Sequence, residues 1–231
     1  MNYQVIITSL LIHSVCCAQQ LRVAIIDSGL DINDGRFKDK LCKSEYTNLV
    51  THETINDVNG HGTCVTSLVQ EYAKGADYCF LIYKFYSQTD SSDENGKREV
   101  TAIQLAINNS ANIINLSAGG ATYSRPEHTL IHNNPSVTFV VSSGNDGLNL
   151  DEGNNKFYPA SLQEPNVIAV GATVATGKVA KFSNYGSTVK NYEVGDRVSC
   201  AAIGKGNVYL SGTSLSTAIF SGKLINKLGA K

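Results

Sequence analysis

The chain has 231 residues, which is enough for one domain with a sizeable core and short for two. Its formal net charge is −1 at pH 7 and 17% of its residues are charged, so no strongly basic or acidic surface points to nucleic acid as a partner. The hydrophobic content of 42% and the 20 glycines suit a compact α/β domain with tight turns.

The first 18 residues have the pattern of a secretory signal peptide. Residues 5–11 are largely apolar, and Cys16, Cys17 and Ala18 are small residues before a cleavage point. Because no Lys or Arg precedes Arg22, an N-terminal strand or extension is the alternative. The segment is too short and too interrupted for a permanent anchor. We therefore expect a secreted or extracytoplasmic protein without a stable membrane anchor.

Cleavage after Ala18 would leave Cys42, Cys64, Cys79 and Cys200 in the mature chain. Four cysteines in a secreted chain allow three disulfide pairings, and the sequence does not choose among them. Two of these positions look interior, so buried free thiols are an equal alternative to bridges.

Strand and helix patterns alternate along the chain. Continuous apolar runs, typical of strands buried on both faces of a parallel sheet, lie at 21–26, 79–85, 113–116, 137–141 and 167–170. Helical patterns lie at 62–72, 98–109 and 214–228, and the polar stretch 87–97 is predicted as a surface loop. The alternation predicts a three-layer α/β fold, a doubly wound, mostly parallel sheet flanked by helices. In such a fold ligands bind at the carboxyl ends of strands.

An acid, a base and a nucleophile occur in one order, each within two residues of a glycine. Asp27 ends the first strand, His61 opens a helix and Ser214 opens the last helix. The order Asp, His, Ser is one of those in which serine hydrolase triads occur. Asn145, at the end of another predicted strand, offers a side-chain amide as oxyanion donor beside the backbone N–H of Ser214. These four residues are the predicted catalytic set.

Other polar residues carry weaker alternatives. Asp27 does not fit ribose recognition, because no glycine-rich phosphate turn follows its strand. His128 and His132 are four residues apart, but no third ligand is placed as zinc motifs require, so we expect no metal site. The carboxylates of the 87–97 loop (Asp90, Asp93 and Glu94) have the hardness that calcium prefers, but not the regular spacing of a dedicated site. We therefore expect exposed charge there and no cofactor.

Four further short sequence motifs occur along the same chain, at residues 23–26 (VAII), 113–120 (IINLSAGG), 158–160 (YPA) and 167–172 (VIAVGA). With them the chain resembles the subtilases, the subtilisin-like serine proteases, from about Arg22 to Gly222. This resemblance implies a subtilisin-like fold and polypeptide substrates.

The resemblance also implies where a substrate binds. Ser117, Ala118 and Gly119 would pair with the substrate backbone as an added strand. The pocket for the residue before the scissile bond would be lined by Ser142, Ser143, Gly144 and Phe157. Phe157 stands where many relatives have a smaller residue. Pointing inward, it would fill the pocket and favour small side chains; pointing outward, it would be ordinary packing.

Several departures from the family suggest a minimal and divergent member. Few residues separate Ala18 from the first strand, so we expect no recognisable prodomain, and residues 68–77 leave no room for the family's long calcium loop. Ala218 and Ile219 replace the usual proline and histidine. We expect residues 19–231 to form a single, monomeric catalytic domain that hydrolyses peptides through an acyl-enzyme. A catalytically silent subtilase-like binding protein and an esterase with the same triad are the alternatives.

Overall fold

The structure is a computed structural model and describes residues 20–204 and 206–229, without the side chains of Ser44 and Glu45. The predicted signal peptide (residues 1–18), with Cys16 and Cys17, lies outside the described residues. Within the described part, no helix combines the length and the apolar character needed to cross a bilayer.

A seven-stranded sheet in the order β2-β3-β1-β4-β5-β6-β7 forms the centre of the molecule, and every neighbouring pair in it is parallel. Its strands are β1 (Leu21–Asp27), β2 (Leu41–Asn48), β3 (Tyr78–Lys84), β4 (Ile113–Leu116), β5 (Thr138–Ser142), β6 (Val167–Thr173) and β7 (Asn191–Val194). A separate antiparallel hairpin consists of β8 (Val198–Ala201) and β9 (Asn207–Leu210).

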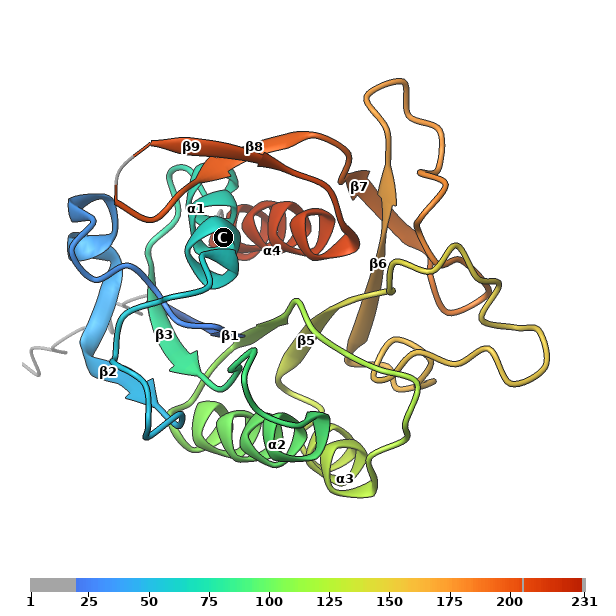
Figure 1. The fold of residues 1–231 in the computed structure, drawn as a ribbon, viewed down its shortest axis with the longest axis horizontal. Helices are drawn as coiled ribbons and strands as arrows, with labels where there is room; N and C mark the ends of the chain where they lie inside the picture. Colours follow the sequence, from blue (N-terminus) through green and yellow to red (C-terminus); the bar gives the residue numbers. More distant parts are fainter. Residues whose placement is uncertain (1–19, 205, 230–231) are drawn as a thin grey trace, which may run out of the picture.

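Helices cover both faces of the sheet (Figure 1). On one face lie α1 (His61–Tyr72) and α4 (Thr213–Gly229), and the β8–β9 hairpin lies beyond them. On the other face lie α2 (Ser92–Asn108) and α3 (Arg125–Asn133), and a short 3-10 helix η1 (Gly35–Lys40) precedes β2. The predicted three-layer α/β fold is confirmed.

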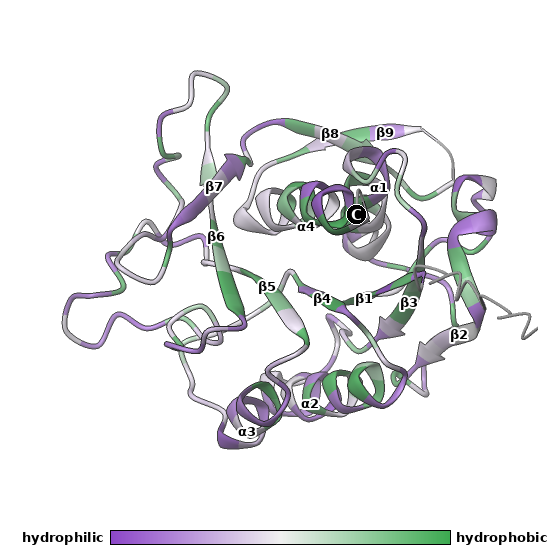
Figure 2. Cartoon of the chain, turned by 180° about the vertical axis from the view of Figure 1, so that it is seen from behind, coloured by the Kyte–Doolittle hydropathy of each residue, from purple (hydrophilic) through white to green (hydrophobic). Residues whose placement is uncertain are grey.

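The alternation of β1 explains why the sheet needs helices on both faces. Successive strand residues point to opposite sides. Val23 and Ile25 pack with the hydrophobic cluster of α1 and α4, whereas Ala24 and Ile26 pack with the cluster of α2 and α3, and all four are fully buried. Figure 2 shows β5 and β6 in hydrophobic colours and the edge strand β7 in hydrophilic ones.

Because all strands of the sheet are parallel, the carboxyl ends of the central strands lie at the same edge of the sheet.

The five predicted strands are confirmed, but the predicted loop over 87–97 is wrong from Ser92 onward, where α2 begins. Ser91 caps this helix: its hydroxyl accepts a hydrogen bond from the Glu94 N–H, and the Glu94 carboxylate accepts one from the Ser91 N–H. Asp93 and Glu94 lie in the first turn, where the helix dipole favours negative charge. The helix therefore begins at Ser92 and includes Asp93 and Glu94, whereas the predicted helix began only at residue 98.

Two disulfides select one of the three possible pairings. Cys42 is bonded to Cys79, which joins β2 to β3, and Cys64 is bonded to Cys200, which joins α1 to β8. The alternative of four free buried thiols is wrong.

Candidate active site

Asp27 and His61 form a close acid–base pair. Asp27 is the last residue of β1 and 5% exposed, and His61 is the first residue of α1. The Nδ1 atom of His61 lies 2.8 Å from Oδ1 and 3.0 Å from Oδ2 of Asp27. The negative charge of Asp27 raises the pKa of His61, and burial opposes this only in part. The carboxylate therefore holds the imidazole by Nδ1 and leaves Nε2 to act on another group.

Gly62 allows α1 to approach the end of β1 closely. A Cβ atom at this position would lie 2.2 Å from the Gly29 carbonyl oxygen and 3.2 Å from the Asp27 Cβ. Any side chain here would push α1 away from the strand. The glycine after His61 is thus required by the contact that pairs His61 with Asp27.

The Asp57 carboxylate fixes the turn that leads into α1, and the sequence analysis did not identify it. Its Oδ1 accepts hydrogen bonds from the Asn59 N–H (3.0 Å), the Gly60 N–H (2.8 Å) and the Ser28 hydroxyl (3.0 Å). Its Oδ2 accepts from the N–H (2.9 Å) and the hydroxyl (2.7 Å) of Thr63. An aspartate shortly before the Gly-His-Gly turn was the signal that could have revealed this cap.

Ser214 lies at the start of α4 and is bonded to the segment that follows β4. Its hydroxyl donates to the Ser117 carbonyl oxygen at 3.0 Å, and the Ser117 hydroxyl donates to the Ser214 carbonyl oxygen at 3.1 Å. Ser214 remains 9% exposed. The reciprocal bonds place this hydroxyl beside the predicted substrate-binding edge.

Thr213 orients the amide of Asn145. The Asn145 Oδ1 accepts from the Thr213 N–H at 2.8 Å and from the Thr213 hydroxyl at 3.0 Å, so its NH₂ group is turned away from Thr213. A Cβ atom placed on Gly212 would lie 3.6 Å from the Asn145 Nδ2 and 3.9 Å from the Ser214 N. The amide nitrogen of Asn145 and the backbone nitrogen of Ser214 therefore both lie within 4 Å of one point beside Gly212.

A cavity of about 250 Å³ lies at this edge of the sheet. Its lining comes from four separate segments and comprises Asp27, Asn59, His61, Phe85, Tyr86, Ser117 and Ala118. The fold thus brings together the predicted acid, base and substrate-binding edge. The sequence analysis had not identified Asn59, Phe85 and Tyr86 as part of this site.

The Phe157 ring points inward, between two of the predicted substrate-binding segments. A Cβ atom on Gly119 would lie 2.5 Å from the Phe157 Cε1, and one on Gly144 would lie 2.8 Å from its Cδ2. Ser142 donates to the Ala118 carbonyl oxygen at 3.3 Å, which holds the two segments together. The Ser143 side chain is fully buried and donates to the Asn184 carbonyl oxygen. The space between the segments is therefore filled by the phenyl ring.

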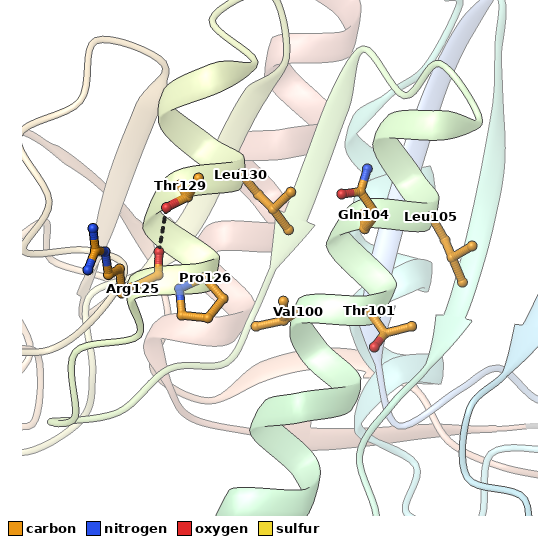
Figure 3. A pocket seen from close by; sticks show the side chains of 8 residues that line it. All are labelled: Val100, Thr101, Gln104, Leu105, Arg125, Pro126, Thr129 and Leu130. Atoms are coloured by element: carbon orange, nitrogen blue, oxygen red, sulfur yellow. Dashed lines mark hydrogen bonds between the residues drawn. The ribbon is translucent and has the colours of Figure 1, made fainter.

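A wider hollow of about 630 Å³ lies between α2 and α3 (Figure 3). Val100 and Leu130 point toward one another across it, and the Thr129 hydroxyl donates to the Arg125 carbonyl oxygen. None of the described residues that line this hollow carries a carboxylate, an imidazole or a serine hydroxyl. Its chemistry is that of a largely apolar groove.

Both histidines considered as zinc ligands, and Asp90 among the carboxylates considered for calcium, have internal partners. Both His128 (2.8 Å) and His132 (3.1 Å) contact the Glu164 Oε1, and Asp90 forms an ion pair with Arg98 at 2.6 Å. Over residues 20–204 and 206–229, no group of three or more His, Cys, Asp or Glu residues is placed to hold a metal ion.

Comparison with known proteins is consistent with this geometry. The family model described as the subtilase family matches residues 18–225. The subtilisin-like serine protease AsES of Sarocladium strictum is 29% identical, over 86% of this chain and 50% of the relative. The minor extracellular protease Epr of Bacillus subtilis (strain 168) is 28% identical, over 86% of this chain and 30% of the relative. The chain thus spans half or less of the length of these two relatives.

Solved structures match the fold of this chain. A cold adapted subtilisin-like serine proteinase matches the fold with a TM-score of 0.76 at 22% identity, over 91% of this chain and 76% of that one. The prenylagaramide maturation protease PagA matches with a TM-score of 0.69 at 30% identity, over 87% of this chain and 72% of that one. Because the family model covers nearly the whole sequence, this chain belongs to the subtilase family.

Proposed function

We propose that this chain is a serine endopeptidase in which Ser214 is the nucleophile, His61 the general base and Asp27 the residue that orients the base. The observation that carries the proposal is the 2.8 Å contact between His61 and Asp27 at the sheet edge where Ser214 is bonded to Ser117. A serine hydroxyl needs such a base to become a nucleophile.

The proposed reaction starts with a rotation of the Ser214 hydroxyl from the Ser117 carbonyl oxygen toward the His61 Nε2. His61 accepts the proton while Ser214 Oγ attacks the scissile carbonyl carbon. The resulting oxyanion is stabilised by the Asn145 NH₂ group and the Ser214 N–H, which flank one space. The C–N bond then breaks, His61 protonates the leaving amine, and water hydrolyses the ester with His61 again as base. Asp27 stays ionised throughout.

The proposed substrate is an extended polypeptide with a small residue before the scissile bond. Its backbone would pair with Ser117, Ala118 and Gly119, which follow β4. The Phe157 ring occupies the space between Gly119 and Gly144 in which a larger side chain would be seated. Glycine or alanine therefore fits this position best.

We place the mature protein outside the cytoplasm, as a monomeric single catalytic domain over residues 19–231. Two disulfides support this location, because such bonds persist in oxidising compartments.

Peptide hydrolysis by the purified protein tests the proposal. Ser214→Ala and His61→Ala should each lower kcat/KM by at least about a thousandfold, while His132→Ala, an exposed histidine on α3, should leave it unchanged. Turnover near wild type in either site variant would contradict the triad. Turnover of ester substrates alone would favour the esterase, and turnover of neither substrate would favour the silent binding protein.

A further inference from the structure

Two carboxyl groups meet between α2 and α3, outside the catalytic set. Glu127 lies in the first turn of α3 and is 4% exposed, whereas Glu99, on α2, keeps partial contact with solvent. The charge of Glu127 acts on Glu99, so the two carboxyl groups lie near one another where α2 contacts α3. The Oε1 atom of Glu127 is buried and has no hydrogen-bond partner. A buried carboxylate oxygen without a partner is costly, and a donor group bound there would remove that cost.

The charge of His128 lowers the pKa of Glu127 in part, but His128 forms its ion pair with Glu164. None of the ion pairs among residues 20–204 and 206–229 includes Glu99 or Glu127. The basic groups next to them along the chain are used elsewhere: Arg98 binds Asp90, and His128 binds Glu164. Burial raises the pKa of Glu127 to about 7, and burial together with the charge of Glu127 raises the pKa of Glu99 well above its ordinary value.

The pair lies on the same side of the molecule as the active site. The helices α2 and α3 follow β3 and β4, so both start from the carboxyl edge of the sheet (Figure 1). Asp27 ends β1 and Ser117 follows β4 at this edge, whereas Glu127 lies in the first turn of α3 and Glu99 about two turns into α2. The guanidinium of Arg98, next to Glu99, donates to the Phe85 carbonyl oxygen at 2.9 Å, and Phe85 lines the cavity of His61.

The inner faces of the two helices extend this connection to the substrate-binding edge. Ile103, one turn after Glu99, and Ile131, one turn after Glu127, belong to the hydrophobic cluster against which Ala118 packs. Ala118 is the middle residue of the proposed substrate-binding edge. The proposed substrate-binding edge and the inner faces of the helices that carry the two carboxyl groups therefore share one hydrophobic cluster.

We propose that Glu99 and Glu127 form a binding subsite for a lysine or arginine side chain of the polypeptide substrate, on the N-terminal side of the scissile bond. This inference rests on the proposed protease function. A substrate ammonium or guanidinium group supplies the donors that the unpartnered Glu127 oxygen lacks, and its charge favours ionisation of both carboxyls. Binding therefore releases protons.

A matched peptide series tests the subsite. Each peptide carries alanine before the scissile bond and either lysine or its neutral isostere norleucine at one of the three preceding positions. At pH 8 we expect the kcat/KM ratio of lysine to norleucine to be about tenfold or more at one position. Glu99→Gln and Glu127→Gln should each bring this ratio close to one. Asp93→Asn, which changes an exposed carboxylate on α2, should leave the ratio unchanged.

A binding measurement separates this inference from the proposed function. Calorimetry of the same peptides on the Ser214→Ala protein, in buffers of different ionisation enthalpy, should show preferred binding of the lysine peptide with proton release. This result does not depend on turnover, so an inactive wild-type protein would contradict only the protease proposal. Equal binding and equal turnover of both peptides, or a preference that survives in both glutamine variants, would overturn the subsite.

Discussion

Asp57 and Gly62 decide where the imidazole of His61 lies. Asp57 binds the turn before α1 through both carboxylate oxygens, and Gly62 allows the helix to touch the end of β1. Neither residue would take part in bond making. The acid–base contact at 2.8 Å is therefore a product of backbone placement as much as of the two side chains.

Gly62→Ala should separate His61 from Asp27, because its Cβ atom would lie 2.2 Å from the Gly29 carbonyl oxygen. We expect kcat/KM to fall by about a hundredfold, the order that a displacement of about 1 Å can cost. Gly96→Ala on α2, where an added Cβ meets nothing within 4 Å, is the control and should keep full activity. Steady-state kinetics of the two variants decide this, and an active Gly62→Ala protein would show that the close approach is dispensable.

The pH dependence should report the Asp27–His61 pair. His61 must be neutral to accept a proton, and Asp27 raises its pKa. We expect kcat/KM to rise with pH and to level off only above the ordinary histidine value of about 6.5. In Asp27→Asn this limb should move to lower pH, and kcat should fall by about 10⁴-fold.

The same shift has a sign for stability. Because the folded-state pKa of His61 is raised, protonation of His61 stabilises the fold below the unfolded-state pKa, and this contribution is lost as pH rises through the folded-state value. Asp27→Asn should remove this dependence from the Tm profile. If the acid limb of the kcat/KM profile stayed at the same pH in Asp27→Asn, the proposed role of the Asp27–His61 pair would be contradicted.

At the scale of elements, the helix α2 depends on the cap at Ser91. Ser91→Ala removes the acceptor for the Glu94 N–H and should cost about 1 kcal/mol of unfolding free energy. Ser92→Ala, one residue further on and exposed, is the matched control and should change it little. Urea denaturation of both variants measures the difference, and equal midpoints would argue against the cap.

The disulfide between α1 and β8 should matter more to stability than the one between β2 and β3. The Cys64–Cys200 bond spans 136 residues and the Cys42–Cys79 bond spans 37. From the entropy of loop closure we expect losses of about 5 and about 4 kcal/mol when each pair is replaced by alanine. Denaturant midpoints of the two double variants test the order, which a larger loss for the Cys42/Cys79 variant would reverse.

The sequence predicted the interior of this fold better than its margins. Central strands such as β4 read as apolar runs because both faces are buried, whereas the edge strands β2 and β7 and the β8–β9 hairpin carry mixed side chains and were not predicted. The helix α3 was also missed, although Ser124 caps it and Pro126 stands in its first turn.

The candidate site shows the same division. Asp27 and His61 were predicted from short motifs, and the structure places them in contact. The contributions of Asp57 and Thr213 depend on hydrogen bonds between segments far apart in sequence, which no local pattern reveals. The inward orientation of Phe157 likewise depends on two glycines from different loops.

At the scale of the whole molecule, the Glu99–Glu127 pair should make stability fall as pH rises. Burial raises the pKa of Glu127 from 4.5 to about 7, so the folded state binds a proton more tightly than the unfolded state. The stabilisation is complete below about pH 4.5 and is lost as pH rises through about 7, on the order of 3 kcal/mol. Glu127→Gln should flatten this part of the profile, and Glu71→Gln, an exposed site on α1, should not. A profile that stays steep in Glu127→Gln would assign the effect to other groups.

The central claim is that Ser214 is an activated nucleophile, and covalent labelling measures this most directly. A fluorophosphonate probe reacts with a serine hydroxyl that a neighbouring base activates and whose oxyanion donors are in place. We predict one probe molecule per protein chain, attached to the Ser214-bearing peptide by mass spectrometry, no attachment in Ser214→Ala, and strongly slowed attachment in His61→Ala. Attachment to a different residue, or an unlabelled wild-type protein whose thermal transition shows it to be folded, would contradict the account.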